Sequence, residues 1–152
     1  MNKKGVTLIE LIVVLVIIAI LAGLIAPNMG RWLPRYRLRS ATRNIASTLR
    51  TAQMKAVSNG MLYQVDFTIG ANSYILRYTT GGLDYDDGSV QTAPSGITVD
   101  IASLPGGIAF FNPDSTCPNG GTITLSYQKG GVTQAQKGII LNAATGRTKI
   151  VE

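Results

Sequence analysis

The sequence predicts an α+β fold in which a long N-terminal helix packs on a C-terminal, antiparallel β-rich head. Three patterns predict it: an apolar run near the N-terminus, an apolar stripe with helical spacing in the next segment, and period-two alternation from Met61 onward. The first half of the helix, residues 6–30, is expected to be transmembrane. The second half, residues 31–60, is expected to be amphipathic, and residues 61–152 form the head.

Composition excludes several classes of active site. The chain has 152 residues, 14 Lys and Arg against 8 Asp and Glu, no histidine and one cysteine. Without histidine there is no His-dependent triad and no imidazole metal ligand, and a single cysteine forms no intrachain disulfide and no Cys-rich zinc site. These absences exclude His-dependent catalysis and His- or Cys-rich metal sites.

The N-terminal run has the length of a membrane-spanning helix. Residues 11–26 are sixteen residues without a polar side chain, and extension back to Val6 gives 21 residues broken only by Thr7 and Glu10. About 20 apolar residues cross the hydrocarbon core of a bilayer. A cleavable secretory signal fits less well, because the run is too long and no small-x-small site ends it. A plain membrane anchor is an alternative.

Glu10 is the unusual residue of this run. An acid within a membrane helix is costly and usually functional, with a partner that neutralises it. The alternative is a shallow position at the level of the lipid headgroups.

The segment from Lys3 to Glu10, Lys-Lys-Gly-Val-Thr-Leu-Ile-Glu, resembles the class III signal of type IV pilins and type II secretion pseudopilins. The resemblance implies that prepilin peptidase removes residues 1–5 by cutting between Gly5 and Val6, and methylates the new N-terminus. Glu10 becomes the fifth mature residue. Val6 departs from the Phe or Met that is most frequent at that position. Pro27 stands where many pilins carry a helix-loosening proline.

The resemblance also implies how the subunit assembles. The helix is stored in the bacterial inner membrane as a single pass, with the head in the periplasm, and later packs among other pilins or pseudopilins. Glu10 then neutralises the Val6 amine of a neighbouring subunit. An unpaired charge is heavily penalised in such a low-dielectric place, so the pair selects the axial register. A methylated amine keeps its charge.

The second helix is expected from Arg35 to Ser58, with Pro27 and Pro34 interrupting the helix before it and Asn59-Gly60 ending it. Its apolar stripe, at spacings of three and four, consists of Leu38, Ala41, Ile45, Leu49, Ala52 and Ala56.

The remaining faces of this helix are basic. Seven cations occur with no acid between residues 28 and 65, and they are Arg31, Arg35, Arg37, Arg39, Arg43, Arg50 and Lys55. Anionic lipid headgroups, acidic loops of neighbouring subunits and nucleic acid are the three candidate partners. Next to a membrane helix, we favour the first two.

The head reads as antiparallel strands joined by Gly-rich turns, with a polar loop over Leu83–Ser95. The expected strands are 61–68, 73–79, 97–101, 108–111, 122–127, 138–141 and 147–151. A long helix followed directly by such strands resembles the GspH/FimT group of minor pseudopilins. Gly107–Asp114 and the pair Gly138–Leu141 with Thr145–Arg147 resemble two local patterns of that group.

Three features of the head admit a functional and a structural interpretation. Asp84, Asp86 and Asp87 form a solvated acidic loop, with calcium binding as the weaker alternative because no distal Glu completes an EF-hand. The loop could also face the basic helix of a neighbour. Cys117 lies in a turn-rich loop, either as a small, partly buried side chain or as a thiol that pairs between subunits.

Arg147 and Lys149 carry the DNA-binding alternative. DNA-uptake members of the FimT type have a C-terminal Gly-Arg-x-Arg motif, and Gly146-Arg147-Thr148-Lys149 resembles it. Residues 56–152 hold five basic and seven acidic side chains, which disfavours a general electrostatic footprint for DNA.

The sequence thus predicts a minor pilin or pseudopilin, a structural subunit of a type II secretion pseudopilus or type IV pilus that initiates assembly or lies at the tip. Together with the resemblance of the N-terminal segment to this family, the absence of histidine and of a second cysteine leads us to expect no metal, no cofactor and no enzymatic activity. Its expected partners are prepilin peptidase, other pilins, inner-membrane lipid and the inner-membrane assembly platform. The alternative is a DNA-binding minor pilin for natural transformation, with double-stranded DNA as a further partner.

Overall fold

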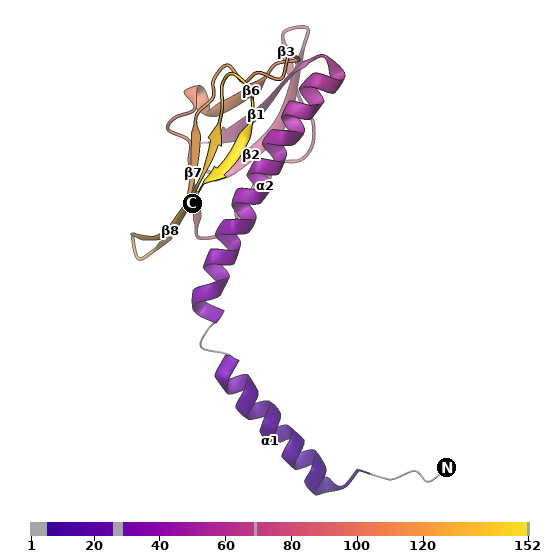
Figure 1. Ribbon diagram of the computed structural model, residues 1–152, viewed down its shortest axis with the longest axis vertical. Coiled ribbons are helices and arrows are strands. Elements are labelled where there is room, and N and C mark those ends of the chain that lie inside the picture. Colours follow the sequence, from indigo (N-terminus) through magenta and orange to yellow (C-terminus); the bar gives the residue numbers. More distant parts are fainter. Residues whose placement is uncertain (1–5, 26–28, 69, 152) are drawn as a thin grey trace, which may run out of the picture. The chain divides into compact units, whose positions relative to one another are not determined.

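The computed structural model describes residues 6–25, 29–68 and 70–151, and it divides into two compact units, Met1–Leu33 and Pro34–Glu152. Gly5 and Pro27, the expected cleavage and kink residues, lie outside the described residues. The first unit contains α1 (Leu8–Ile25). The second unit is an α+β head in which a helix packs on antiparallel sheets, as the sequence predicts (Figure 1).

The second helix, α2 (Met29–Asn59), begins six residues earlier than expected. Pro34 lies inside it, so the prediction that this proline interrupts the helix was wrong. The fixed φ of proline is compatible with a helix, and the loss is confined to one backbone donor and local crowding. The predicted end is confirmed, because α2 stops at Asn59 and Gly60 follows with a φ of 64°.

The predicted apolar stripe of α2 is the face that the head covers. Each of its six residues is at most 3% exposed, and Thr42 beside it is 1% exposed. Thr42 Oγ1 donates to the Leu38 carbonyl over 2.8 Å, which satisfies the buried hydroxyl within the helix.

One sheet has the strand order β3-β2-β1-β6, with β4 also pairing β2. Its strands are β1 (Leu62–Thr68), β2 (Ser73–Thr80), β3 (Leu83–Asp86), β4 (Gln91–Thr92) and β6 (Ile108–Phe111). The alternation along β1 places Tyr63, Val65 and Phe67 in the core. Phe67 stands opposite Tyr74 of β2, with their ring centroids 5.7 Å apart.

The expected loop over Leu83–Ser95 is wrong in part, because it contains β3 and β4. Gly81 and Gly82 both have positive φ, 61° and 78°, as a two-residue hairpin turn requires. The turn sets Leu83–Asp86 against β2. All four β3 residues are exposed, so the strand carried no burial pattern that the sequence could reveal.

The other sheet has the order β5-β7-β8-β9. Its strands are β5 (Ile97–Asp100), β7 (Thr122–Lys129), β8 (Val132–Leu141) and β9 (Thr148–Val151). The turn predicted at Lys129–Gly131 is confirmed, but β8 starts at Val132, six residues before the expected strand. A short 3₁₀ helix, η2 (Pro105–Gly107), precedes β6.

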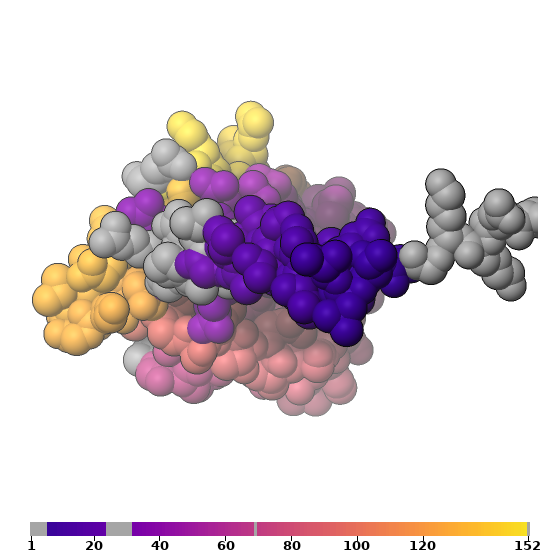
Figure 2. Space-filling model, turned by 90° about the horizontal axis from the view of Figure 1, so that it is seen from below, coloured from indigo at the N-terminus to yellow at the C-terminus, as the bar shows by residue number. Residues whose placement is uncertain are grey.

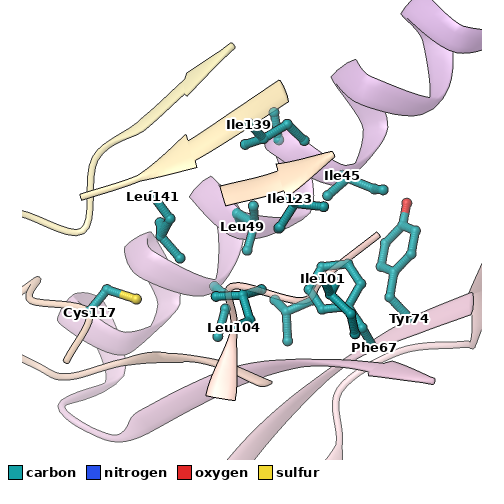
Figure 3. Packing of buried hydrophobic residues seen from close by; sticks show 14 of the residues in the cluster. Ile45, Leu49, Phe67, Tyr74, Ile101, Leu104, Cys117, Ile123, Ile139 and Leu141 are labelled. Carbon is teal, nitrogen blue, oxygen red and sulfur yellow. The ribbon is translucent and has the colours of Figure 1, made fainter. Parts of the chain in front are cut away.

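The core lies between α2 and the two sheets (Figure 3). Ile45 and Leu49 of α2 lie toward Ile123 of β7 and Ile139 of β8. The remaining residues of the cluster include Leu38, Val65, Phe111, Cys117, Leu125 and Leu141.

Candidate functional site

The first candidate site is the start of α1. The Thr7 hydroxyl oxygen accepts a hydrogen bond from the Glu10 backbone N–H over 3.3 Å, and the Leu11 N–H donates to the Thr7 carbonyl over 3.2 Å. Thr7 therefore caps the helix and Glu10 occupies its first turn. Thr-x-x-Glu is the spacing of a capping box, and an acid in the first turn interacts favourably with the helix dipole. Glu10 thus has a local structural role available to it.

The helix α1 is apolar on all sides. The large apolar residues from Val6 to Leu21 are 49–77% exposed, and their atoms form the indigo surface in Figure 2. Glu10 is exposed among them. Burial of apolar surface stabilises by about 25 cal/mol per Å², so α1 would be stabilised by an apolar environment on all of its sides. Among the residues that the structure describes, no helix is long and apolar enough to cross a membrane.

The basic face of α2 is partly used within the chain itself. Lys55 Nζ lies 2.7 Å from Asp87 Oδ2, so this part of the acidic loop pairs with its own helix. Arg50 donates to the Thr148 carbonyl over 3.4 Å and ties α2 to β9. Such half-exposed contacts contribute little stability.

The remaining acidic side chains of the β2–β3 hairpin have separate partners. Asp84 accepts hydrogen bonds from Thr79 and Gln64 over 2.6 and 3.1 Å, and Arg77 Nε lies 2.6 Å from Asp86. Arg77 also reaches Asp66 over 2.7 Å. Burial raises the pKa of Asp66, and Arg77 opposes that rise. Within the described ranges, no three His, Cys, Asp or Glu residues come close enough together to hold a metal ion.

Arg147 and Lys149 are both exposed, but only Lys149 lies on β9, which begins one residue after Arg147. Arg147 belongs to the turn before the strand, where its carbonyl accepts from the Asn142 N–H over 3.0 Å.

Position 146 requires a glycine for a structural reason that the sequence did not reveal. It is buried with a φ of 61°, and a Cβ there would meet the Ser115 carbonyl oxygen and lie 2.6 Å from Gln53 Nε2. The Gln53 side chain is fixed beside Gly146 because its Nε2 donates to the Thr145 carbonyl over 2.9 Å and to Ser115. The Gly-Arg pattern therefore owes its glycine to packing against α2.

Cys117 is fully buried, in agreement with the structural interpretation of this residue. Its Sγ lies 3.6 Å from Asn119 Oδ1, and burial raises the pKa of the thiol to about 11. The thiol is protonated at neutral pH, and a buried, protonated thiol is a poor nucleophile.

Comparison with known proteins matches both parts of the chain. Residues 1–26 match the family described as the prokaryotic N-terminal methylation motif. The fold resembles the type IV minor pilin FimU of Pseudomonas aeruginosa strain PAO1, with a TM-score of 0.58 at 15% identity over 76% of this chain and 93% of that one. The match to a second crystal form of FimU has a TM-score of 0.56 at 16% identity, over 78% of this chain and 90% of that one. The match to the minor pseudopilin EpsH of the type 2 secretion system of Vibrio cholerae has a TM-score of 0.60 at 12% identity, over 76% of this chain and 95% of that one.

Proposed function

We propose that this chain, which is type IV pilin-like in its N-terminal motif and its fold, is a minor pilin or minor pseudopilin, a structural subunit rather than an enzyme. Prepilin peptidase cuts after Gly5 and methylates the Val6 amine. The subunit waits in the inner membrane with its head in the periplasm. It then joins a pseudopilus or pilus through the inner-membrane assembly platform, at the start of assembly or at the tip.

The observation that carries the proposal is the combination of the N-terminal motif with an α1 that is apolar on all sides. The large apolar residues from Leu8 to Leu21 lie on every side of α1 and are not buried against one another within the helix. A helix that is hydrophobic all round belongs inside a lipid bilayer or in the core of a larger assembly. A filament subunit occupies these two environments in turn.

Glu10 favours movement of the helix from the membrane into the filament. In lipid, an unpaired ionised carboxylate near the helix end is costly. In a filament core, the Val6 amine of a neighbour offers a charge of opposite sign. The difference between these two states drives correct incorporation, and the capping contact of Thr7 leaves the Glu10 carboxylate to make this pair, because it uses the Glu10 backbone N–H.

Processing is the first experiment. The full chain is expressed with and without an active prepilin peptidase, and its intact mass is measured after extraction. We expect loss of residues 1–5 and gain of one methyl group only with the peptidase. Gly5→Leu should remain uncut, whereas Gly23→Ala, a substitution with open space around it in α1, should be cut normally. A chain that stays full-length beside active peptidase would leave the plain anchor as the better function.

The second candidate function is DNA binding through Arg147 and Lys149. The exposure of both cations favours it, since phosphate contacts require accessible side chains. The Arg guanidinium can donate two parallel N–H hydrogen bonds to one phosphate, whereas the Lys ammonium interacts with it as a point charge.

The DNA candidate is tested by the salt dependence of duplex binding to the full chain in nonionic detergent micelles. If both side chains contact phosphates, Arg147→Ala/Lys149→Ala should reduce the slope of log K against log salt by about 2. Lys129→Ala, an exposed cation at the end of β7, is the matched control. Identical slopes for all three proteins would remove Arg147 and Lys149 from consideration.

A further inference from the structure

The strand β3 lies at the end of its sheet, with β2 on one side. All four of its residues are exposed. The Asp87 N–H donates to the Leu76 carbonyl over 2.8 Å, so this pair, which follows Asp86 in the register, is hydrogen-bonded. Hydrogen-bonded and non-hydrogen-bonded pairs alternate in an antiparallel ladder. The backbone N–H and C=O groups of Asp84 and Asp86 therefore point away from β2.

The other three terminal strands of the two sheets, β6, β5 and β9, are closed by side chains. The Asn119 amide accepts from an N–H of β6 over 3.0 Å and donates to one of its carbonyls. The Asn72 amide oxygen accepts from an N–H of β5 over 3.0 Å, and Arg50 donates to a carbonyl of β9 over 3.4 Å. Among the described residues, no side chain closes the edge at Asp84 and Asp86 in this way. This edge is therefore a template for one further strand.

Contacts at both ends hold β3 in an extended conformation. The turn at Gly81 and Gly82 joins it to β2, and Lys55 Nζ lies 2.7 Å from Asp87 Oδ2 just beyond its last residue. Tyr85 also stacks on Tyr78 of β2, with ring centroids 5.5 Å apart and ring planes 20° apart. An edge that is already ordered loses little conformational entropy when a strand is added to it.

The two faces of β3 differ in chemistry, because successive side chains of a strand point to opposite sides. One face carries Asp84 and Asp86. The other carries Leu83 and Tyr85, which are 62% and 43% exposed. The side chain of Asp86 is 57% exposed, and its ion pair with Arg77 uses Oδ1. Oδ2 of Asp86 can therefore accept a hydrogen bond from an incoming cation.

The charge of the acidic face indicates which strand would fit. Asp66 and Asp86 share Arg77, and Asp84 lies within the same network, so carboxylates outnumber guanidinium groups among the described residues of this face. Two copies of β3 paired edge to edge would place carboxylates opposite one another, and like charges directly opposite are destabilising. Cations opposite Asp84 and Asp86 are favourable in the same positions. An apolar residue between these cations would lie beside Tyr85.

We propose that the edge of β3 binds an extended segment of another protein, in which cationic and apolar residues alternate, as one further strand of the sheet. The outward backbone groups of Asp84 and Asp86 form its hydrogen bonds, and their carboxylates face its cations. Leu83 and Tyr85 pack against its apolar side chains. This surface uses no residue of α1 and neither of the cations considered for DNA binding. The inference therefore goes beyond the proposed function and does not rest on it.

The test uses the full chain in nonionic detergent micelles and a labelled, capped peptide with the sequence Thr-Lys-Val-Lys-Val-Thr. Fluorescence anisotropy measures binding, and hydrogen exchange measured by nuclear magnetic resonance reports the N–H groups of Asp84 and Asp86. Three further peptides serve as controls. Thr-Lys-Lys-Val-Val-Thr keeps the composition without the alternation, and Thr-Glu-Val-Glu-Val-Thr reverses the charge. The third is the first peptide with both lysine N–H groups methylated, which removes the donors that face β3.

Three variants of the chain separate the charges from the backbone. Asp84→Asn/Asp86→Asn removes the two charges and keeps the backbone. Asp86→Pro also removes an outward N–H, and proline is tolerated on an edge strand where the N–H makes no ladder bond. Asp100→Asn is the matched control, since Asp100 is an exposed acid on β5 of the other sheet. The melting temperature of each variant checks that the head remains folded.

We expect the alternating Lys-Val peptide to bind and to slow hydrogen exchange at Asp84 and Asp86. The double Asn variant should bind it about fivefold more weakly, as the loss of two cross-strand charge pairs implies. Asp86→Pro should weaken binding about tenfold or more, because a backbone donor is lost as well. Asp100→Asn should bind like the unsubstituted chain, and the three control peptides should not bind measurably.

Three results would overturn the proposal. The first is absence of binding of the alternating peptide to the unsubstituted chain. The second is equal binding of the non-alternating or N-methylated lysine peptide, because it would show charge attraction without strand addition. The third is slowed exchange at Asp84 and Asp86 without peptide that increases with protein concentration and is lost in Asp86→Pro. That result would assign the edge to a second copy of the chain.

Discussion

Glu10→Ala is expected to be cleaved after Gly5 as efficiently as the unsubstituted chain and yet to be missing from filaments. In the proposed function, the peptidase acts at the Gly5–Val6 bond, and the carboxylate is needed only later, when α1 enters a core in which the amine of the neighbouring Val6 must be neutralised. An amine left unpaired in a low-dielectric site costs several kcal/mol, which is enough to exclude the subunit. Intact mass reports the cleavage, and immunoblotting of sheared filaments reports incorporation.

The control for Glu10→Ala comes from the cap of α1. Thr7→Ala removes the oxygen that accepts from the Glu10 N–H but keeps the carboxylate, at a cost of about 1 kcal/mol in helix stability. We expect Thr7→Ala to enter filaments. If Glu10→Ala also enters them, or if both variants fail to the same degree, Glu10 acts as a capping residue and the pairing with Val6 is disproved.

Gly146→Ala is expected to destabilise the head by about 2–5 kcal/mol. A non-glycine residue at a φ of 61° costs roughly 1–2 kcal/mol, and overpacking of a closed site costs about 1–3 kcal/mol. The new methyl group would press on the Ser115 carbonyl and on Gln53, whose amide ties α2 to the turns at Ser115 and Thr145. The melting temperature, followed by circular dichroism, should fall by about 10 °C.

Gly130→Ala is the matched control for this prediction. Gly130 has a φ of 60°, close to that of Gly146, but open space surrounds the position of its Cβ. It therefore isolates the backbone cost from the cost of crowding. Equal loss of stability in the two variants would show that contact with Gln53 and Ser115 does not constrain Gly146.

Local patterns in the sequence predicted the elements that depend on burial. The spacing of Leu38, Ile45 and Leu49 identified the buried face of α2, and the alternation of Tyr63, Val65 and Phe67 identified the core face of β1. Because the core removes these side chains from water, the apolar residues recur at the spacing of the helix or strand, and this spacing is visible in the sequence. The N-terminal motif was equally local, because its residues are contiguous in the sequence.

Strands whose residues are mainly exposed could not be predicted from hydrophobic periodicity. The strand β3 has no buried residue, and the first six residues of β8 beyond the turn are mainly exposed, so neither had a periodic signal. Pro34 was predicted to interrupt a helix that in fact continues through it. Propensity is a weak guide at such positions, and context decides.

The sequence by itself therefore determined the α+β class, the apolar helix with its single acid and the stripe on which the head packs, because each depends on residues close together in the chain. Only the tertiary structure decided the contacts between distant segments. These include Lys55 with Asp87, and Gln53 with the turns that enclose Gly146. Their partners are set by how α2 docks on the sheets, a choice made by the core and not by the charges themselves.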